Sequence, residues 1–340
     1  MTRQRRFALL LLVLTALVAA WFWQSSGANR APPPMTSASS ADAEASVTES
    51  EFRFDTEATA ALPSTARRPP VVLPPLGTPP AKVIDALLPA ARSGDAKAQC
   101  RLGVELGACQ VVQTHLDDLR RTIQRAESRA ESGGDDLFAL KLAELELALT
   151  ERREACAALD VAGLVQERDW LLDAARQGHA EAALRYLDGQ SLGYESALLS
   201  AGIVPWGVMR HPGWAAWQRE SPRIANALLD NGQADVLFLL TLAYSDDNTP
   251  LSGLYPNDPV RRAAHQIALR RSQPGRANER DFTEGMAPSD ALAARQEADA
   301  LLARLRGGTA SMERVATIFK PTATALLPRS TGPDAPAPCE

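Results

Sequence analysis

The sequence lacks the residue patterns that accompany most catalytic chemistry. It has only four histidines and four cysteines in 340 residues. No histidine forms a His-Glu-x-x-His pair or another close metal-ligand spacing. No Cys-x-x-Cys pair and no phosphate-binding glycine loop occur either. We therefore do not expect an enzyme, and we expect no catalytic residue, metal ligand or cofactor.

Positive charge is also not in excess. The formal net charge is −5, and no stretch combines basic residues with interleaved aromatic residues, as nucleic-acid-binding proteins do. β-Branched residues are sparse between residues 81 and 320, and few stretches alternate apolar and polar residues. The composition therefore argues against a nucleic-acid partner and against a sheet-rich fold.

The first 23 residues have the pattern of an export signal. Arg3, Arg5 and Arg6 precede an uncharged apolar run at residues 7–23, whose 17 residues suit the short end of membrane-spanning length. Arginines on this side predict a single-pass inner-membrane anchor with a periplasmic domain. The alternative is a signal peptide cleaved after Ala20, which would release a secreted or periplasmic form.

Two segments have the composition of disordered chain. Residues 24–80 contain ten of the 24 prolines with much Ala, Ser and Thr, so they cannot bury enough apolar surface to fold. Residues 321–340 are again rich in Pro and Ala. We expect a linker that separates the membrane from a folded domain at 81–320, followed by a disordered tail.

The region 81–320 is predicted to be all-α. Ala, Leu, Arg, Glu and Gln dominate it, and its apolar residues are spaced by three and four. One phrase occurs twice, as LLPAARSGDAKAQCRLG from Leu87 and LLDAARQGHAEAALRYL from Leu171. A weaker third copy surrounds Gly232. The shared positions are Ala90, Ala91, Gly94 and Ala98 in the first copy, and Ala174, Ala175, Gly178 and Ala182 in the second.

Each copy reads as a helix that ends at the glycine and a second helix that begins within two residues. These phrases resemble Sel-one-like repeats, which are related to tetratricopeptide repeats. The resemblance implies a solenoid of stacked helix pairs that acts as an adaptor. The alternative is an irregular helical bundle with chance similarity.

The spacing of the copies implies an inserted helical hairpin at about 110–158, which turns at Gly133 and Gly134. That turn would place Cys109 and Cys156 opposite each other in the hairpin, so we expect a disulfide between them. The disulfide would stabilise the folded state by about 4 kcal/mol. Cys100 is expected to be a buried small apolar residue, and Cys339 to be free or to bridge two chains.

The densest aromatic stretch is GIVPWGVMRHPGWAAWQRESP, from Gly202. It carries Trp206, Met209, Trp214 and Trp217, residue types that are enriched at interface cores. They either pack a junction between repeats or form a partner-binding site.

These features together predict a membrane-anchored periplasmic repeat scaffold that binds a protein partner in the cell envelope. One alternative is a membrane-tethered foldase for a secreted enzyme, since that class also combines an anchor, a Pro/Ala-rich spacer and long helices. An envelope hydrolase is the other alternative.

Overall fold

The computed structural model describes residues 71–130, 146–147, 149–194, 205–245, 249–273, 282–311, 314–315, 318 and 338–339, all within one compact unit, Arg68–Glu340. The described part is all-helical and contains no strand, as the composition predicts. Its helices are α2 (Pro80–Arg92), α3 (Ala96–Ala130), α5 (Val161–Glu167), α6 (Trp170–Arg176), α7 (Ala180–Asp188), α9 (Trp214–Asp230), α10 (Val236–Ala243), α11 (Pro259–Arg271) and α12 (Pro288–Arg304), with the 3₁₀ helices η1 (Gln190–Leu192), η2 (Pro205–Arg210) and η3 (Pro250–Gly253).

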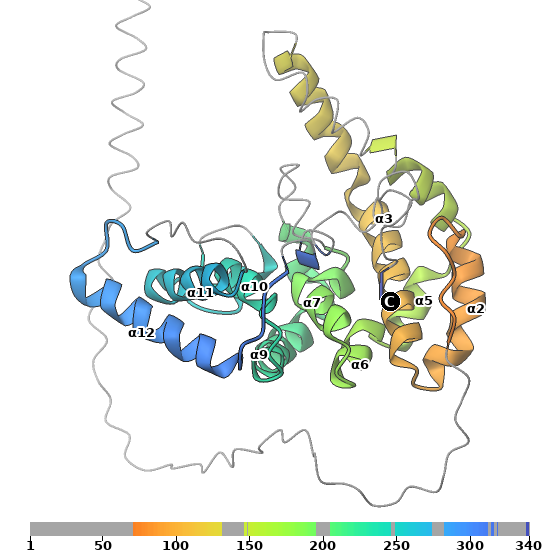
Figure 1. Ribbon diagram of the computed structural model, residues 1–340. Helices are drawn as coiled ribbons and strands as arrows, with labels where there is room; N and C mark the ends of the chain where they lie inside the picture. The colour runs from red at the N-terminus through yellow and green to blue at the C-terminus, as the bar shows by residue number, and fades with distance from the viewer. Residues whose placement is uncertain are drawn as a thin grey trace, which may run out of the picture. The chain divides into compact units, whose positions relative to one another are not determined.

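Most of the helices pack on the next one along the chain (Figure 1). Helix α2 packs on α3, α3 on α6, α6 on α7, and α7 on α9. Helix α10 packs on α11, and α11 on α12. Most of the large interfaces therefore join helices that follow one another, and the α3–α6 interface, with α5 between them in the chain, is the exception.

The same turn occurs at each of the three repeated glycines. Gly94, Gly178 and Gly232 have φ values of +90°, +87° and +73°, the left-handed conformation that favours glycine. Each glycine N–H donates to the carbonyl three residues earlier, at 2.9–3.0 Å. The following N–H donates to the carbonyl five residues before itself, at 2.9–3.1 Å. This pair of hydrogen bonds is the Schellman motif that ends a helix, so the third copy keeps the turn although its sequence has diverged.

Small residues bring the helices of neighbouring copies together. The alanines at 91, 98, 174 and 182 are fully buried, Ala175 is nearly so, and Ala90 packs at the edge of the core. A Cβ added to Gly103 would lie 2.7 Å from the Leu171 Cγ atom. Helices α3 and α6 therefore approach more closely than a larger residue at 103 would allow.

Helix α3 is longer than the sequence predicts. It runs without a break for 35 residues, so the second helix of the first copy continues directly into the predicted hairpin. Gly103 and Gly107 lie inside it, where each closely approaches a neighbouring segment. A Cβ at Gly107 would lie 3.0 Å from the Gln190 carbonyl oxygen. The predicted turn at 133–134 lies outside the described residues.

The disulfide predicted for the hairpin, Cys109–Cys156, is confirmed. Cys109 on α3 is bonded to Cys156 in the facing helical segment, with a Cα–Cα distance of 5.7 Å. Further along the same pair, Arg120 Nε donates to Glu146 Oε1 at 2.9 Å. These two contacts show that the two segments are antiparallel, as expected for a hairpin.

Cys100 is buried as expected, but it is disulfide-bonded, and Cys339 is neither free nor bonded to a second chain. Cys100 and Cys339 form a second disulfide, with a Cα–Cα distance of 5.8 Å. Pro338 and Cys339 are buried, so this part of the predicted disordered tail belongs to the folded unit. The pairing joins residues 239 apart in sequence, and contacts of that range leave no local pattern. Two disulfides indicate an oxidising compartment outside the cytoplasm.

The folded unit also begins earlier than residue 81. Val71 and Leu73 pack against the hydrophobic core, since apolar side chains between prolines are buried as readily as those in a helix. No helix of the described ranges is long and apolar enough to cross a membrane. The predicted anchor at residues 7–23 lies outside those ranges, as do residues 24–70 of the predicted linker.

Candidate functional site

The tryptophan-rich stretch is divided between core and surface. Trp217 on α9 is buried, and its Nε1–H donates to the Tyr186 carbonyl oxygen of α7 at 2.7 Å. The Trp214 ring stacks on Trp217 with a centroid distance of 5.0 Å and is only partly buried. Met209 in η2 is 41% exposed. The Trp206 side chain lies outside the described part.

These positions assign different roles to the four predicted residues. Trp217 joins α9 to α7 and is too buried to contact a partner directly. Met209 and the outer part of Trp214 remain accessible, next to exposed Arg210. We call Met209, Arg210 and Trp214 the Met209 surface.

The Met209 surface includes a hydrogen-bonded turn at residues 211–214. His211 Nδ1 accepts from the Gly213 N–H at 3.0 Å, and the Trp214 N–H donates to the His211 carbonyl at 2.9 Å. Burial lowers the pKa of His211, which favours the neutral ring that can accept this bond. The turn therefore fixes where α9 starts and which way Trp214 faces.

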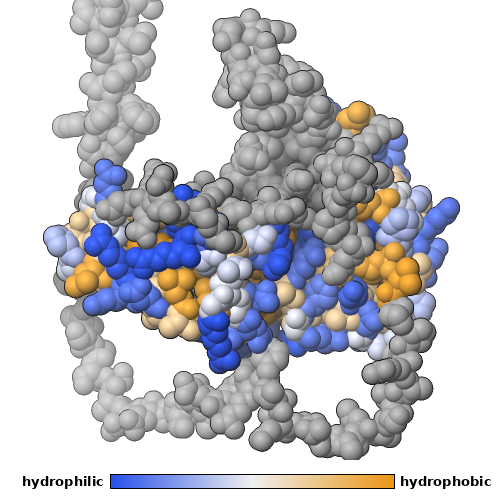
Figure 2. All heavy atoms as spheres, in the orientation of Figure 1, coloured by the Kyte–Doolittle hydropathy of each residue, from blue (hydrophilic) through white to orange (hydrophobic). Residues whose placement is uncertain are grey.

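Exposed apolar side chains are otherwise few. Among the described residues the large ones are Val72, Leu147, Met209 and Leu292. Figure 2 shows hydrophobic and hydrophilic residues interspersed over the visible face. Scattered residues of this kind do not mark an interface by themselves, but Met, Arg and Trp, the residue types at 209, 210 and 214, are enriched in interface cores.

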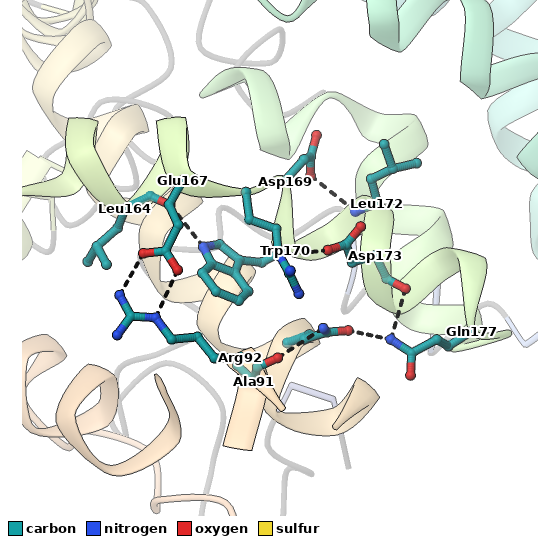
Figure 3. A network of polar contacts seen from close by, with 11 residues as sticks. Ala91, Arg92, Leu164, Glu167, Asp169, Trp170, Leu172, Asp173 and Gln177 are labelled. Carbon is teal, nitrogen blue, oxygen red and sulfur yellow. Dashed lines mark hydrogen bonds and ion pairs between the residues drawn. The ribbon is translucent and has the colours of Figure 1, made fainter. Parts of the chain in front are cut away.

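A polar network joins the first two copies of the repeated turn (Figure 3). Arg92, the last residue of α2, donates through Nε and Nη2 to the two carboxylate oxygens of Glu167, at 2.8 and 2.6 Å. Gln99 Nε2 donates to the Ala91 carbonyl at 3.0 Å, and Gln177 donates to Gln99. The Arg92 hydrogen bond lowers the pKa of Glu167. Arg92 and Glu167 are exposed, and their ion pair links the end of α2 to the end of α5.

Two arginines at equivalent places in the first two copies are completely buried. Arg101 pairs with Glu105 one turn later, Nη2 to Oε1, at 3.0 Å. Arg185 pairs with Glu181 one turn earlier, at 2.7 Å. The sequence shows the Arg101–Arg185 match, but a repeat pattern does not show that the side chains are buried.

Glu105 also binds Arg152 of the facing hairpin segment. All three side chains are at least 95% buried, and no hydrogen-bond partner reaches Arg152 Nε. Burial, followed by the positive charge of Arg101, lowers the pKa of Arg152. We call Arg101, Glu105 and Arg152 the buried triad. Arg101, Glu105 and Cys109 are spaced by four residues, which places them on one face of a helix. This spacing could have indicated the buried triad from the sequence.

The sequence contains one motif that is known from enzymes and has not yet been considered. Residues 189–193, Gly-Gln-Ser-Leu-Gly, match the Gly-x-Ser-x-Gly motif of serine hydrolases. In that motif the serine lies on a strained turn between a strand and a helix. Here Ser191 lies in η1, directly after helix α7, and has no positive φ. The structural context therefore does not support a nucleophilic serine.

The described part of the chain contains no cluster of three or more His, Cys, Asp or Glu residues that could hold a metal ion. His115 and His265 are buried, and each contacts a backbone carbonyl, Gly193 at 3.2 Å and Arg261 at 2.7 Å respectively. The arrangement is that of structural histidines.

No protein-family model, curated protein or solved structure matches this chain. A functional conclusion must therefore be drawn from the residues and their geometry.

Proposed function

We propose that this protein is a membrane-anchored scaffold of the periplasm, built from Sel-one-like repeats, which binds a protein partner in the cell envelope. The observation that supports the proposal best is the repeated turn. Three glycines end their helices with the same pair of hydrogen bonds, and the helices after the first two pack on the next copy, α3 on α6 and α7 on α9. A solenoid of helix pairs has this organisation, and such solenoids work by presenting an extended surface.

The location follows from two kinds of observation. Two buried disulfides indicate an oxidising compartment, and the basic residues before the apolar run at 7–23 predict an anchor whose downstream chain is exported. Intact mass of the protein from the membrane fraction and from the soluble fraction distinguishes the two forms. A retained anchor gives the full-length mass, and cleavage after Ala20 removes the anchor and shifts the protein to the soluble fraction.

The proposed contact site is the Met209 surface. Met209 is replaced by a photo-crosslinking benzoylphenylalanine in the full-length protein, in the cells that produce it. The matched control carries the same residue at Leu292 on α12, which is 56% exposed. We expect one light-dependent adduct of defined mass at 209 that is absent at 292. No adduct at 209, or the same adducts at both positions, would contradict a contact at this surface.

A further inference from the structure

Three arginines gather around one carboxylate at helix α9. Glu220 Oε2 lies 3.2 Å from Arg176 Nη2 at the end of α6. Glu220 Oε1 lies 3.9 Å from Arg219 Nε and 3.7 Å from Arg223 Nη1. All three arginine side chains are exposed, whereas the Glu220 side chain is 11% exposed. Because one carboxylate balances only one of the three positive charges, these four side chains carry a formal net charge of +2.

At three other places on the surface one arginine pairs with one carboxylate. These pairs are Arg92 with Glu167, Arg168 with Asp173, and Arg304 of α12 with Asp230 at the far end of α9. Residues 205–229 contain three arginines and one glutamate, in a chain whose net charge is −5. The turn before α9 and the first part of α9 therefore form a positive patch on an acidic protein.

The arginines of α9 lie on its outward face. Ala215, Arg219 and Arg223 are exposed and spaced by four residues, so they follow one face of the helix. We call these three residues the α9 ridge. Trp214 directly precedes the ridge, and Arg219 lies about 7.5 Å further along the helix axis. The ridge therefore continues the Met209 surface and adds positive charge to it.

We propose that the Met209 surface and the α9 ridge together bind an acidic segment of a partner protein, in which carboxylates flank a large apolar side chain. This inference rests on the proposed scaffold function and specifies the chemistry of its partner. The apolar side chain packs on Met209 and Trp214, and the carboxylates pair with Arg210 and Arg219. Arginine binds a carboxylate through two parallel N–H groups, and Trp and Arg are among the residue types that dominate the energies of interfaces.

The distance between Trp214 and Arg219 suits an extended segment. Alternate residues of an extended chain point to the same side and lie about 6.6 Å apart. This spacing is close to the axial distance of about 7.5 Å between the two residues of α9. We therefore expect a partner sequence with Asp or Glu two positions before and two positions after the apolar residue.

The probe is the dye-labelled peptide Thr-Glu-Thr-Trp-Thr-Glu-Thr. Its β-branched residues favour an extended chain, which places both glutamates and the tryptophan on one side. Fluorescence anisotropy measures its binding to the full-length protein in a non-ionic detergent, at about 50 mM salt to limit screening. A second peptide with glutamine in place of both glutamates should bind about tenfold or more weakly, as for the loss of hydrogen bonds to a charged group. No binding of the first peptide, or equal binding of the two, would overturn the proposal.

Charge reversal in the protein tests which arginines take part. Arg219→Glu should weaken binding of the acidic peptide about tenfold, because like charges then face each other. Arg210→Glu should have a similar effect, and it leaves the ion pairs of Glu220 in place. The matched control is Lys82→Glu on α2, an exposed residue whose reversal changes the net charge equally. It should weaken binding less than about twofold, since distant surface charges are largely screened.

Thermal unfolding verifies that the three variants fold. If Lys82→Glu weakens binding as much as Arg219→Glu and Arg210→Glu do, the peptide is attracted by the charge of the whole protein, and the site is refuted. Competition with glycerophosphoglycerol, the soluble headgroup of phosphatidylglycerol, tests for a membrane ligand. Displacement of the peptide by this headgroup at a lower concentration than by unlabelled peptide would assign the surface to lipid and overturn the proposal.

The crosslinking experiment separates this inference from the scaffold function. Arg219→Glu is added to the protein that carries benzoylphenylalanine at Met209, and Lys82→Glu is again the control. We expect the light-dependent adduct to be lost in the first and kept in the second. An adduct that persists with Arg219→Glu would overturn the acidic segment and leave the scaffold function standing. Discrimination between the peptides without any adduct in cells would support the acidic-segment site and contradict the scaffold's contact.

Discussion

Replacing Glu105 by glutamine should destabilise the protein more than removing either of its partners' charges. Glu105 is the carboxylate of the buried triad and faces two guanidinium groups. The Glu105→Gln variant leaves the buried guanidinium groups of Arg101 and Arg152 without the carboxylate that pairs with both. Breaking a buried ion pair from one side costs about 3–5 kcal/mol. That is a large fraction of the stability of a typical domain, roughly 5–15 kcal/mol.

Arg152→Met should cost much less, under about 1.5 kcal/mol. The variant loses the attraction between Arg152 and Glu105, but it also removes a desolvated charge whose Nε has no hydrogen-bond partner. Arg101 still neutralises Glu105 through contacts of 3.0–3.1 Å. Methionine fills a similar volume and adapts to an irregular cavity.

Urea unfolding at neutral pH with both disulfides intact measures the difference, since a change of midpoint at constant slope reports stability. The control is Glu146→Gln, which breaks a similar but partly exposed pair with Arg120. Its cost should stay below about 1 kcal/mol. The account of the triad is wrong if Glu105→Gln costs no more than Glu146→Gln, or if Arg152→Met costs more than Glu105→Gln.

Three further variants test other parts of the fold. Burial raises the pKa of Asp169 to about 6, so its charged form destabilises the native state increasingly as pH rises from about 4 to 6. Asp169→Asn keeps the helix cap and should match the parent at pH 4 but exceed its stability by up to about 3 kcal/mol at pH 7; a pH-independent difference would contradict this. Gly103→Ala should cost about 1–3 kcal/mol because its Cβ would overlap Leu171, and Leu171→Ala should relieve part of that cost in a double-mutant cycle. Trp217→Phe loses the hydrogen bond to the Tyr186 carbonyl and should lower the unfolding free energy by about 1–2 kcal/mol; an unchanged midpoint would exclude that role.

Local features of the fold were predictable from the sequence. A glycine at the end of an apolar helical pattern has few alternatives to the left-handed turn, so Gly94 and Gly178 could be placed before the structure was known. The Cys109–Cys156 pairing was also predictable, because an antiparallel hairpin fixes which residues face each other. In both cases the determining contacts lie close along the chain or follow from one regular element.

Contacts that depend on tertiary packing could not be predicted. The unbroken run of α3 through Gly103 and Gly107, where it closely approaches Leu171 and Gln190, is one such feature. The burial of Trp217 and the exposure of Met209 depend on how α9 lies against α7. The Cys100–Cys339 pairing depends on a segment whose composition matches that of disordered chain.

The Cys100–Cys339 disulfide has a consequence for how the molecule matures. An exported chain emerges in sequence order, so Cys100, Cys109 and Cys156 reach the oxidising compartment well before Cys339. During that interval only one native bridge can close, and Cys100 must either stay reduced or be rescued from a wrong partner by an isomerase. We therefore expect the yield of correctly oxidised protein to depend on whether Cys100 stays unpaired until Cys339 arrives.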